Sequence, residues 1–198
     1  MRKRYLWLLA FSFLLMRSLT FAGPIIQNVD GNGSWMDGNQ WGQSFVAEDI
    51  YIDYISAYVA DWNQHLGSPF QMTMTLYGGN GFGGPSLASH TVLLPDGFGG
   101  VNGSGAWWDV DFNGVQLSVG NTYTFSVTSL NGRGGIWYSS SDQYANGYLW
   151  LSGSAQTGAD LMFRVIPDAA PVPEPATMLL LGSGLVGLAG FRRRYTKK

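Results

Sequence analysis

The sequence predicts an all-β fold: an antiparallel, two-layer, jelly-roll-like sandwich, flanked by an N-terminal signal peptide and a C-terminal transmembrane helix. Three observations predict it. The central segments alternate apolar and polar residues with period two. The breaks between them contain Gly-Gly, Asn-Gly and Asp-Gly pairs, which suit tight turns. Basic and apolar residues gather at both ends of the chain. A small barrel is the alternative architecture for the middle.

The strand pattern is clearest in two segments. Residues 71–77 place Met72, Met74 and Leu76 on one face, and residues 122–128 do the same with alternate aromatic and aliphatic residues. Such a pattern indicates a strand with one buried face. Further strands are predicted at 51–59, 87–94, 107–112, 136–139, 148–151 and 161–166. About nine strands at this spacing favour a sandwich over residues 23–167.

The N-terminus has the plan of a secretory signal peptide over residues 1–22. A basic start, Arg2 to Arg4, precedes an almost wholly apolar run from Leu6 to Met16. Small residues then suit a signal peptidase, and cleavage is expected between Ala22 and Gly23. The apolar run is too short for a comfortable membrane span, which favours cleavage.

The C-terminus divides into three parts. Residues 168–175 are rich in proline and are expected to form an extended linker. Residues 176–191 form an apolar segment of 16 residues, short for a stable span of about 20. The tail 192–198 begins with Arg192, Arg193 and Arg194, which would hold that end in the cytoplasm.

The order of these parts resembles the PEP-CTERM sorting signal of Gram-negative bacteria. The motif residues are Val172, Pro173, Glu174 and Pro175. The resemblance implies that an exosortase, a membrane protease, recognises the Pro-Glu-Pro element and removes the tail. Residues 176–191 would then be a transient anchor in the inner membrane, and the arginine cluster its stop. The protein would end at the cell surface or outside the cell.

The middle of the chain is similar in layout to β-sandwich domains found ahead of such tails, and to galactose-binding-like and carbohydrate-binding modules. The similar segments are Gln43–Ala47, Leu76–Gly79, Trp108 with Phe112, Leu117–Tyr123 and Asp160–Arg164. The resemblance implies a structural or adhesive role in exopolysaccharide or biofilm matrix.

Charge argues against one class of partner. Only Arg133 and Arg164, of 11 Lys and Arg residues, lie in the middle of the chain, whereas 12 of the 13 acidic residues lie between Asp30 and Asp168. A domain this acidic offers no basic surface to a phosphate backbone, so we expect no nucleic-acid partner.

Catalytic and metal motifs are weak. Residues 109–114 match the first half of a calcium loop, but Gly120 stands where the bidentate glutamate belongs. We expect a plain strand there, with Trp108, Val110 and Phe112 inward and Asp109 and Asp111 in solvent. Calcium held elsewhere, with Asp30, Asp37 or Asp142, stays open, but no metal site or cofactor is predicted. His65 and His90 lack partners at metal spacing and are expected at the surface or in turns. The neighbouring acids Glu48 and Asp49 point apart on a strand, so we expect no glycoside hydrolase and no enzyme.

Aromatic residues are the stronger functional lead. Many lie beside Gly, Asn, Asp or Ser, a setting in which rings stack on sugars while polar groups bind hydroxyls. The opposing interpretation is that a sandwich without cysteine needs large rings in its core. Trp107 and Trp108 must face opposite ways on one strand, so one of them is core and the other is not. The candidate glycan contacts are Trp35, Trp41, Trp62, Trp137 and Trp150.

Overall fold

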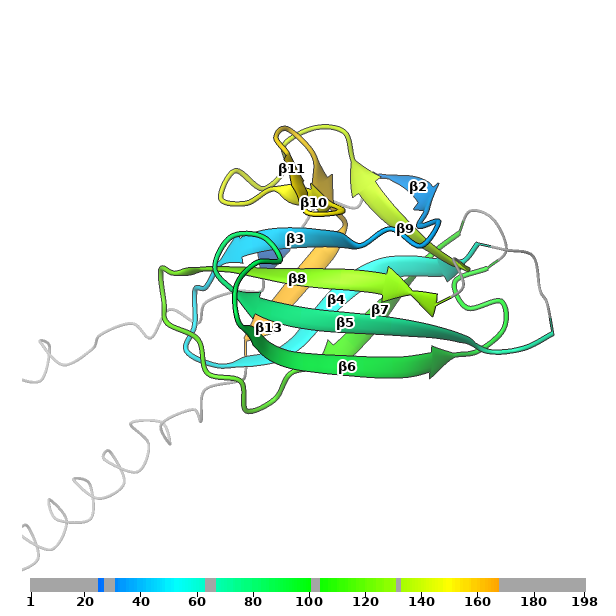
Figure 1. The fold of residues 1–198 in the computed structure, drawn as a ribbon, viewed down its shortest axis with the longest axis horizontal. Helices are drawn as coiled ribbons and strands as arrows, with labels where there is room; N and C mark the ends of the chain where they lie inside the picture. Colours follow the sequence, from blue (N-terminus) through cyan, green and yellow to red (C-terminus); the bar gives the residue numbers. More distant parts are fainter. Residues whose placement is uncertain (1–24, 27–30, 63–66, 101–103, 131–132, 168–198) are drawn as a thin grey trace, which may run out of the picture. The chain divides into compact units, whose positions relative to one another are not determined.

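Thirteen β-strands build the fold in this computed structural model, which describes residues 25–26, 31–62, 67–100, 104–130 and 133–167 (Figure 1). The strands are β1 (Ile25–Ile26), β2 (Asn32–Trp35), β3 (Trp41–Val46), β4 (Ile52–Asp61), β5 (Phe70–Gly78), β6 (Ser86–Leu94), β7 (Ala106–Asp111), β8 (Thr122–Ser129), β9 (Gly134–Ser139), β10 (Leu149–Leu151), β11 (Ser154–Gln156), β12 (Asp160–Leu161) and β13 (Phe163–Pro167).

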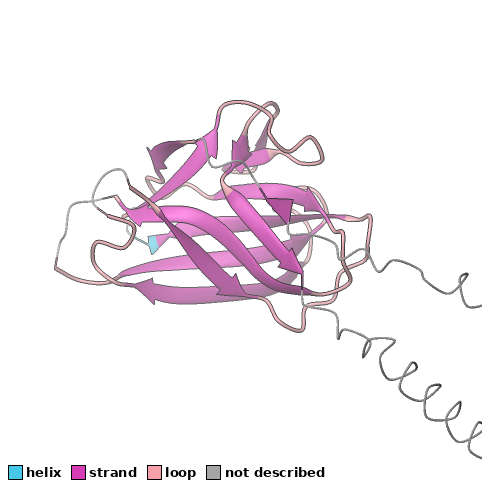
Figure 2. Ribbon diagram, turned by 180° about the vertical axis from the view of Figure 1, so that it is seen from behind, coloured by secondary structure: helices cyan, strands magenta, loops and turns pink. Residues whose placement is uncertain are grey.

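The strands form two antiparallel sheets that face each other. One has six strands in the order β11-β10-β3-β8-β5-β6. The other has seven: β1-β13-β4-β9-β12, with β2 paired to β9 and β7 paired to β4. Figure 1 views the molecule with the six-stranded sheet in front, and Figure 2 views it from behind. Two separate sheets make a sandwich, so the two-layer prediction is confirmed and the barrel alternative is excluded.

The core lies between the sheets and follows the predicted alternation. Met72, Met74 and Leu76 of β5 are fully buried, and Phe125 of β8 meets Phe163 of β13 across the core at 5.8 Å between ring centroids. On β7, Trp108 and Val110 point inward, whereas the alternate residues Asp109 and Asp111 are exposed. Inward side chains from both layers therefore supply the apolar burial on which a cysteine-free domain depends.

The structure has more strands than the sequence pattern indicates. β2 and β3 fall outside the predicted segments, as do the short β1 and β11. β3 reads Trp-Gly-Gln-Ser-Phe-Val and is buried at almost every position, polar residues included, so period-two alternation is absent. The single strand predicted at 161–166 is two strands, β12 and β13, which break at Met162.

Several predictions concern residues outside the described part of the chain. These are the signal peptide with its Ala22–Gly23 cleavage point, the linker 168–175, the membrane segment 176–191, the arginine cluster, Asp30 and His65. Within the described residues, no helix has the length and apolarity that crossing a membrane requires.

Candidate functional site: an aromatic surface on the seven-stranded sheet

Four aromatic side chains lie together on the outer face of the seven-stranded sheet. β4, β7 and β9 point their alternate residues inward to the core, which turns Tyr58, Trp107 and Trp137 outward. Tyr58 and Trp107 are direct cross-strand partners. Trp62, just after the end of β4, completes the group. We call Tyr58, Trp62, Trp107 and Trp137 the aromatic surface.

The rings form a continuous row with edge-to-face geometry. Tyr58 lies 5.1 Å from Trp107 and 5.6 Å from Trp137, measured between ring centroids, with interplanar angles of 73° and 88°. Trp62 extends the row, 5.7 Å from Trp137. Edge-to-face pairs at these distances attract each other through their quadrupoles. The rings of the row therefore stabilise one another's positions.

A surface cavity of about 500 Å³ opens along this row, lined by Gly31, Tyr58, Ser104, Ala106, Trp107, Trp137 and Met162. Trp137 and Met162 are buried, whereas Tyr58 and Trp107 are half-buried. The Tyr58 hydroxyl donates to the carbonyl oxygen of Ser104 at 2.9 Å, which fixes the ring. Met162, between β12 and β13, bridges β9 and β4: its N–H donates to the Trp137 carbonyl, and its carbonyl accepts from the Tyr58 N–H.

Glycines in the strands make room for Trp62. A Cβ atom on Gly33 would lie 2.7 Å from the Trp62 ring, and one on Gly135 would lie 2.6 Å from it. β2 pairs with β9 so that Gly33 lies opposite Trp137, and Trp35 opposite Gly135. The Trp62 indole therefore lies over two glycines without side chains, Gly33 of β2 and Gly135 of β9. Larger residues there would displace it.

Polar groups border the row on the side of β13. The Arg164 guanidinium lies over the Trp107 ring, 3.6 Å from its centroid, a cation–π contact. Opposite Arg164 in the sheet, Ser56 donates to Asp109 Oδ1 at 2.6 Å. The other cation among the described residues, Arg133, is buried. Donors and acceptors thus lie beside the flat rings, as in sites that bind polar organic ligands.

A buried ionic cluster anchors the other end of the row. Arg133, just before β9, pairs with Asp61 at the end of β4 and with Asp96, and donates to the Ser68 carbonyl at 2.7 Å. Its own carbonyl accepts from the Trp62 N–H at 2.8 Å. The cluster therefore fixes the backbone from which Trp62 projects.

A second polar cluster joins the two sheets. Gln43 of β3 donates to Asp160 Oδ1 at 2.7 Å and accepts from the Leu161 N–H, while Asp160 Oδ2 accepts from the Gln143 and Tyr144 N–H groups. Desolvation by burial raises the pKa of Asp160 despite these hydrogen bonds. Desolvation also raises the pKa of Tyr144, whose hydroxyl accepts from the Val46 N–H.

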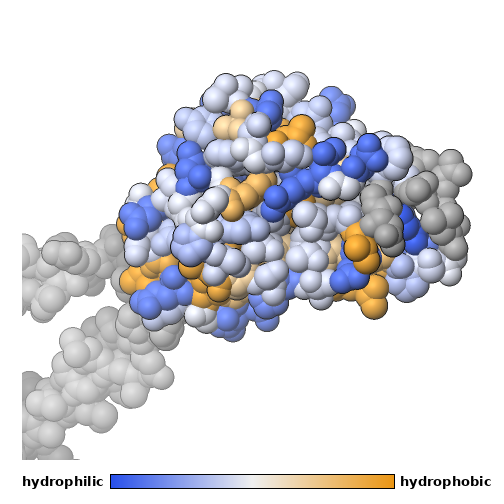
Figure 3. Space-filling model, in the orientation of Figure 1, coloured by the Kyte–Doolittle hydropathy of each residue, from blue (hydrophilic) through white to orange (hydrophobic). Residues whose placement is uncertain are grey.

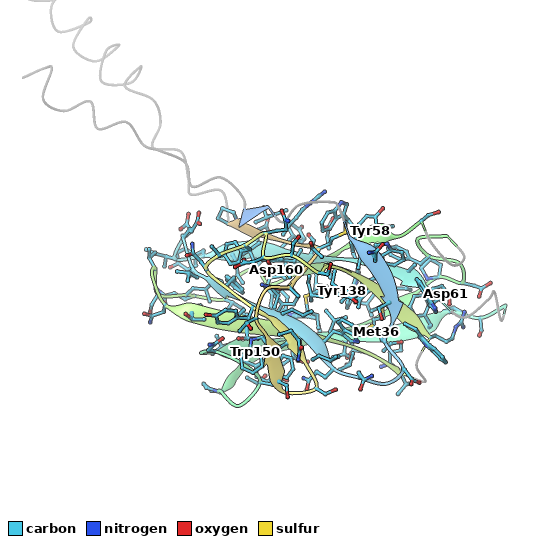
Figure 4. The ribbon with its side chains drawn as sticks, turned by 90° about the horizontal axis from the view of Figure 1, so that it is seen from above. Met36, Tyr58, Asp61, Tyr138, Trp150 and Asp160 are labelled. Carbon is cyan, nitrogen blue, oxygen red and sulfur yellow. The ribbon has the colours of Figure 1, made fainter. Side chains whose placement is uncertain are left out.

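The five tryptophans singled out in the sequence do not form one surface. Trp62 and Trp137 belong to the row, and Trp35 of β2 is 46% exposed. Trp41 belongs to the main core between the sheets, away from the aromatic surface. Trp150 packs against Phe82 at 6.0 Å on the six-stranded sheet. Figure 4 shows Trp150 and Tyr58 on opposite sides of the sandwich, with Tyr138 and Asp160 between them.

Sequence reasoning missed three residues of this site. Tyr58, Met162 and Arg164 carry no motif and stand in ordinary strand sequence. Trp107 was identified only as half of an ambiguous pair, and the structure resolves the ambiguity, because Trp108 is the core residue. The one available signal was the alternation of strand residues: Tyr58 and Trp107 occupy outward-facing positions on strands whose other face is predicted to be buried.

The remaining predicted positions are surface features. Asp109 and Asp111 are exposed, and Asp111 accepts from the Asn113 N–H, which closes the turn after β7. His90 lies exposed on β6, with its ring 5.0 Å from that of Phe112. The described residues contain no group of three or more His, Cys, Asp or Glu that could hold a metal ion.

Comparisons with known proteins identify the C-terminal tail. A solved structure of TmCBM61 in complex with beta-1,4-galactotriose is similar at 14% identity and a TM-score of 0.30, over 61% of this chain and 69% of that one. No curated protein matches the chain. Residues 171–194 match the model of the PEP-CTERM protein-sorting motif, a range that includes Val172 to Pro175 and the three arginines. The chain therefore carries a PEP-CTERM protein-sorting motif at its C-terminus, and this motif implies export and processing by an exosortase.

Proposed function

We propose that the protein is a non-enzymatic, exported matrix or adhesion protein, which holds extracellular polysaccharide through its aromatic surface. The observation that carries this proposal is the row Trp107–Tyr58–Trp137, three rings that line one cavity and that Trp62 extends. Arg164 lies over the Trp107 ring. Flat rings accept the C–H faces of a sugar, while the neighbouring polar groups bind its hydroxyls. The cavity of about 500 Å³ falls within the range typical of small-ligand sites.

The lining of the cavity supports binding without hydrolysis. Glycoside hydrolysis requires two carboxyl groups that flank the scissile bond. The residues that line the cavity include no carboxylate and no histidine, and Asp109, at the border, accepts a hydrogen bond from Ser56. The rival hypothesis of a secreted hydrolase therefore has no support at this surface.

The route to the surface follows from the sorting motif. A signal peptide cleaved before Gly23 would start export, and segment 176–191 would hold the protein in the inner membrane until an exosortase removed it. The sandwich would then face the polysaccharide outside the cell. Its strand order, with β2-β9-β4-β7 opposite β3-β8-β5-β6, supports a jelly-roll-like description of this domain.

The test is a binding titration of the domain 23–167 against neutral and acidic polysaccharides. This piece contains every described strand and the core between them, so it is expected to fold alone. Trp107→Ala should weaken binding about tenfold or more, because it removes one ring of the row. Trp150→Ala is the matched control, since it removes a half-buried indole from the opposite face. Equal losses in both variants, or no binding by a folded wild-type domain, would refute the proposal.

A further inference from the structure

The outer edge of β6 is the longest exposed strand edge among the described residues. β6 ends the six-stranded sheet, and within the described residues it pairs only with β5. Of its nine residues, Leu94 alone is buried. Leu93 is 69% exposed, and Leu87 is 41% exposed. Figure 3 shows hydrophobic surface at the lower edge of the view, where Figure 1 places β6.

The other terminal strands of the two sheets are protected, and β6 is not. β1 and β12 have two residues each, β11 has three and β2 has four, so each offers few backbone groups to a further strand. β7 carries Asp109 and Asp111, whose charges oppose pairing. β6 contains no charged residue and no proline over nine residues. Unpaired N–H and C=O groups on a long, uncharged edge form a template for another strand.

We propose that β6 is a dimer interface, on which β6 of a second copy of this chain pairs antiparallel about His90 and joins the two six-stranded sheets. The flanking residues define this register. Pro85 and Pro95 bound the strand, and because proline has no N–H, pairing is limited to residues 86–94. The midpoint of that window is His90.

The sequence of β6 is complementary to itself in this register. On the outer face, Leu87 of each copy lies opposite Leu93 of the other, which covers the two exposed leucines. Ser89 lies opposite Thr91, and both already pair with hydroxyls of β5 at 2.8 Å. Cross-strand pairs of like polarity stabilise a sheet. In the dimer, the hydroxyl groups that pair between β5 and β6 would thus continue across the interface.

The inner face follows the same symmetry. Ala88 lies opposite Val92, and His90 lies opposite its own copy, each ring already resting on Phe112. Val92 is 38% exposed, so the core is incompletely covered at this edge. Pairing would add about eight to ten backbone hydrogen bonds. An interface built mainly from one strand edge is small, so we expect a dissociation constant on the order of micromolar.

The first test measures the mass of domain 23–167 in solution against concentration. The wild type should shift from monomer to dimer, and Leu93→Lys should raise the dissociation constant about tenfold or more, because it puts a charge on the joining edge twice per dimer. Val119→Lys is the control, at a residue 58% exposed outside the strands. A wild type that stays monomeric to about 1 mM overturns the proposal. So does a dimer that Leu93→Lys weakens no more than Val119→Lys.

The second test fixes the register. The chain has no cysteine, so single substitutions give clean cross-links. Oxidation should join His90→Cys to its own copy, because residues directly opposite have Cβ atoms about 4.5–5.5 Å apart. Leu87→Cys should cross-link to Leu93→Cys in a mixture, and neither to itself. Dimerisation without this pattern, or equal cross-linking of Val119→Cys, overturns the register and with it the proposed interface.

Discussion

Replacing Arg133 with methionine should destabilise the domain strongly. The guanidinium neutralises Asp61, which is 1% exposed, and its Cζ atom lies 5.4 Å from the centre of the Phe70 ring. Methionine keeps much of the apolar stem but leaves the Asp61 carboxylate buried with one remaining donor, the Gly97 N–H at 3.0 Å. Asp96 is 27% exposed and regains water more easily.

The expected loss in free energy of unfolding comes mainly from Asp61, because Asp61 is buried and Asp96 is not. Removing one partner of a buried pair typically costs about 3–5 kcal/mol, and the surviving Gly97 bond argues for the lower end, about 3 kcal/mol. That is a large share of the roughly 5–15 kcal/mol by which domains are stable. The double variant Arg133→Met/Asp61→Leu should recover most of the loss, because no unpaired charge stays buried at Asp61.

Urea unfolding followed by tryptophan fluorescence measures these differences. Arg164→Met is the matched control, because it removes the half-buried cation on Trp107 and should cost no more than about 1 kcal/mol. A loss below about 1 kcal/mol for Arg133→Met, or a double variant less stable than the single one, would contradict the assignment of this cluster as the anchor of Trp62.

Two further perturbations test the packing and the buried carboxylate. Gly135→Ala should lower the free energy of unfolding by about 1–3 kcal/mol and change the near-ultraviolet circular dichroism, because the Trp62 ring must shift. Gly83→Ala is the control and should be neutral, since a Cβ atom there would have nothing within 4 Å. Equal effects of the two substitutions would refute the close contact. The pKa of Asp160 is raised in the fold, so the folded state binds its proton more tightly. Melting temperatures should show the wild type gaining stability relative to Asp160→Asn as the pH falls from about 7 to about 4, and an opposite trend would refute the raised pKa.

The strands with one buried face could be predicted from the sequence. Met72, Met74 and Leu76 alternate with polar residues, and the structure buries all three. β3 escaped prediction because burial on both faces removes the alternation: its Gln43 is buried but satisfied by Asp160, far along the chain. Such a partner becomes visible only when the sheets are assembled.

The candidate site was predicted only in part, for a similar reason. Tryptophans beside small and polar residues can be found in a sequence, but which face each occupies depends on pairing. Trp41 and Trp137 both stand in strands, yet one lies in the main core and the other lines the cavity. Tyr58 joins the site because β7 and β9 bring their tryptophans beside it, and local sequence does not encode that convergence.

Exosortase-dependent sorting is tested most directly by the mass of the mature protein recovered from the surface and the medium of cells that contain an exosortase. The mature chain is expected to begin at Gly23 and to lack the segment from Ala176 onward, and a Glu174→Lys variant is expected to keep its tail in the membrane. An intact tail on surface or secreted wild-type protein in such cells would contradict exosortase-dependent sorting.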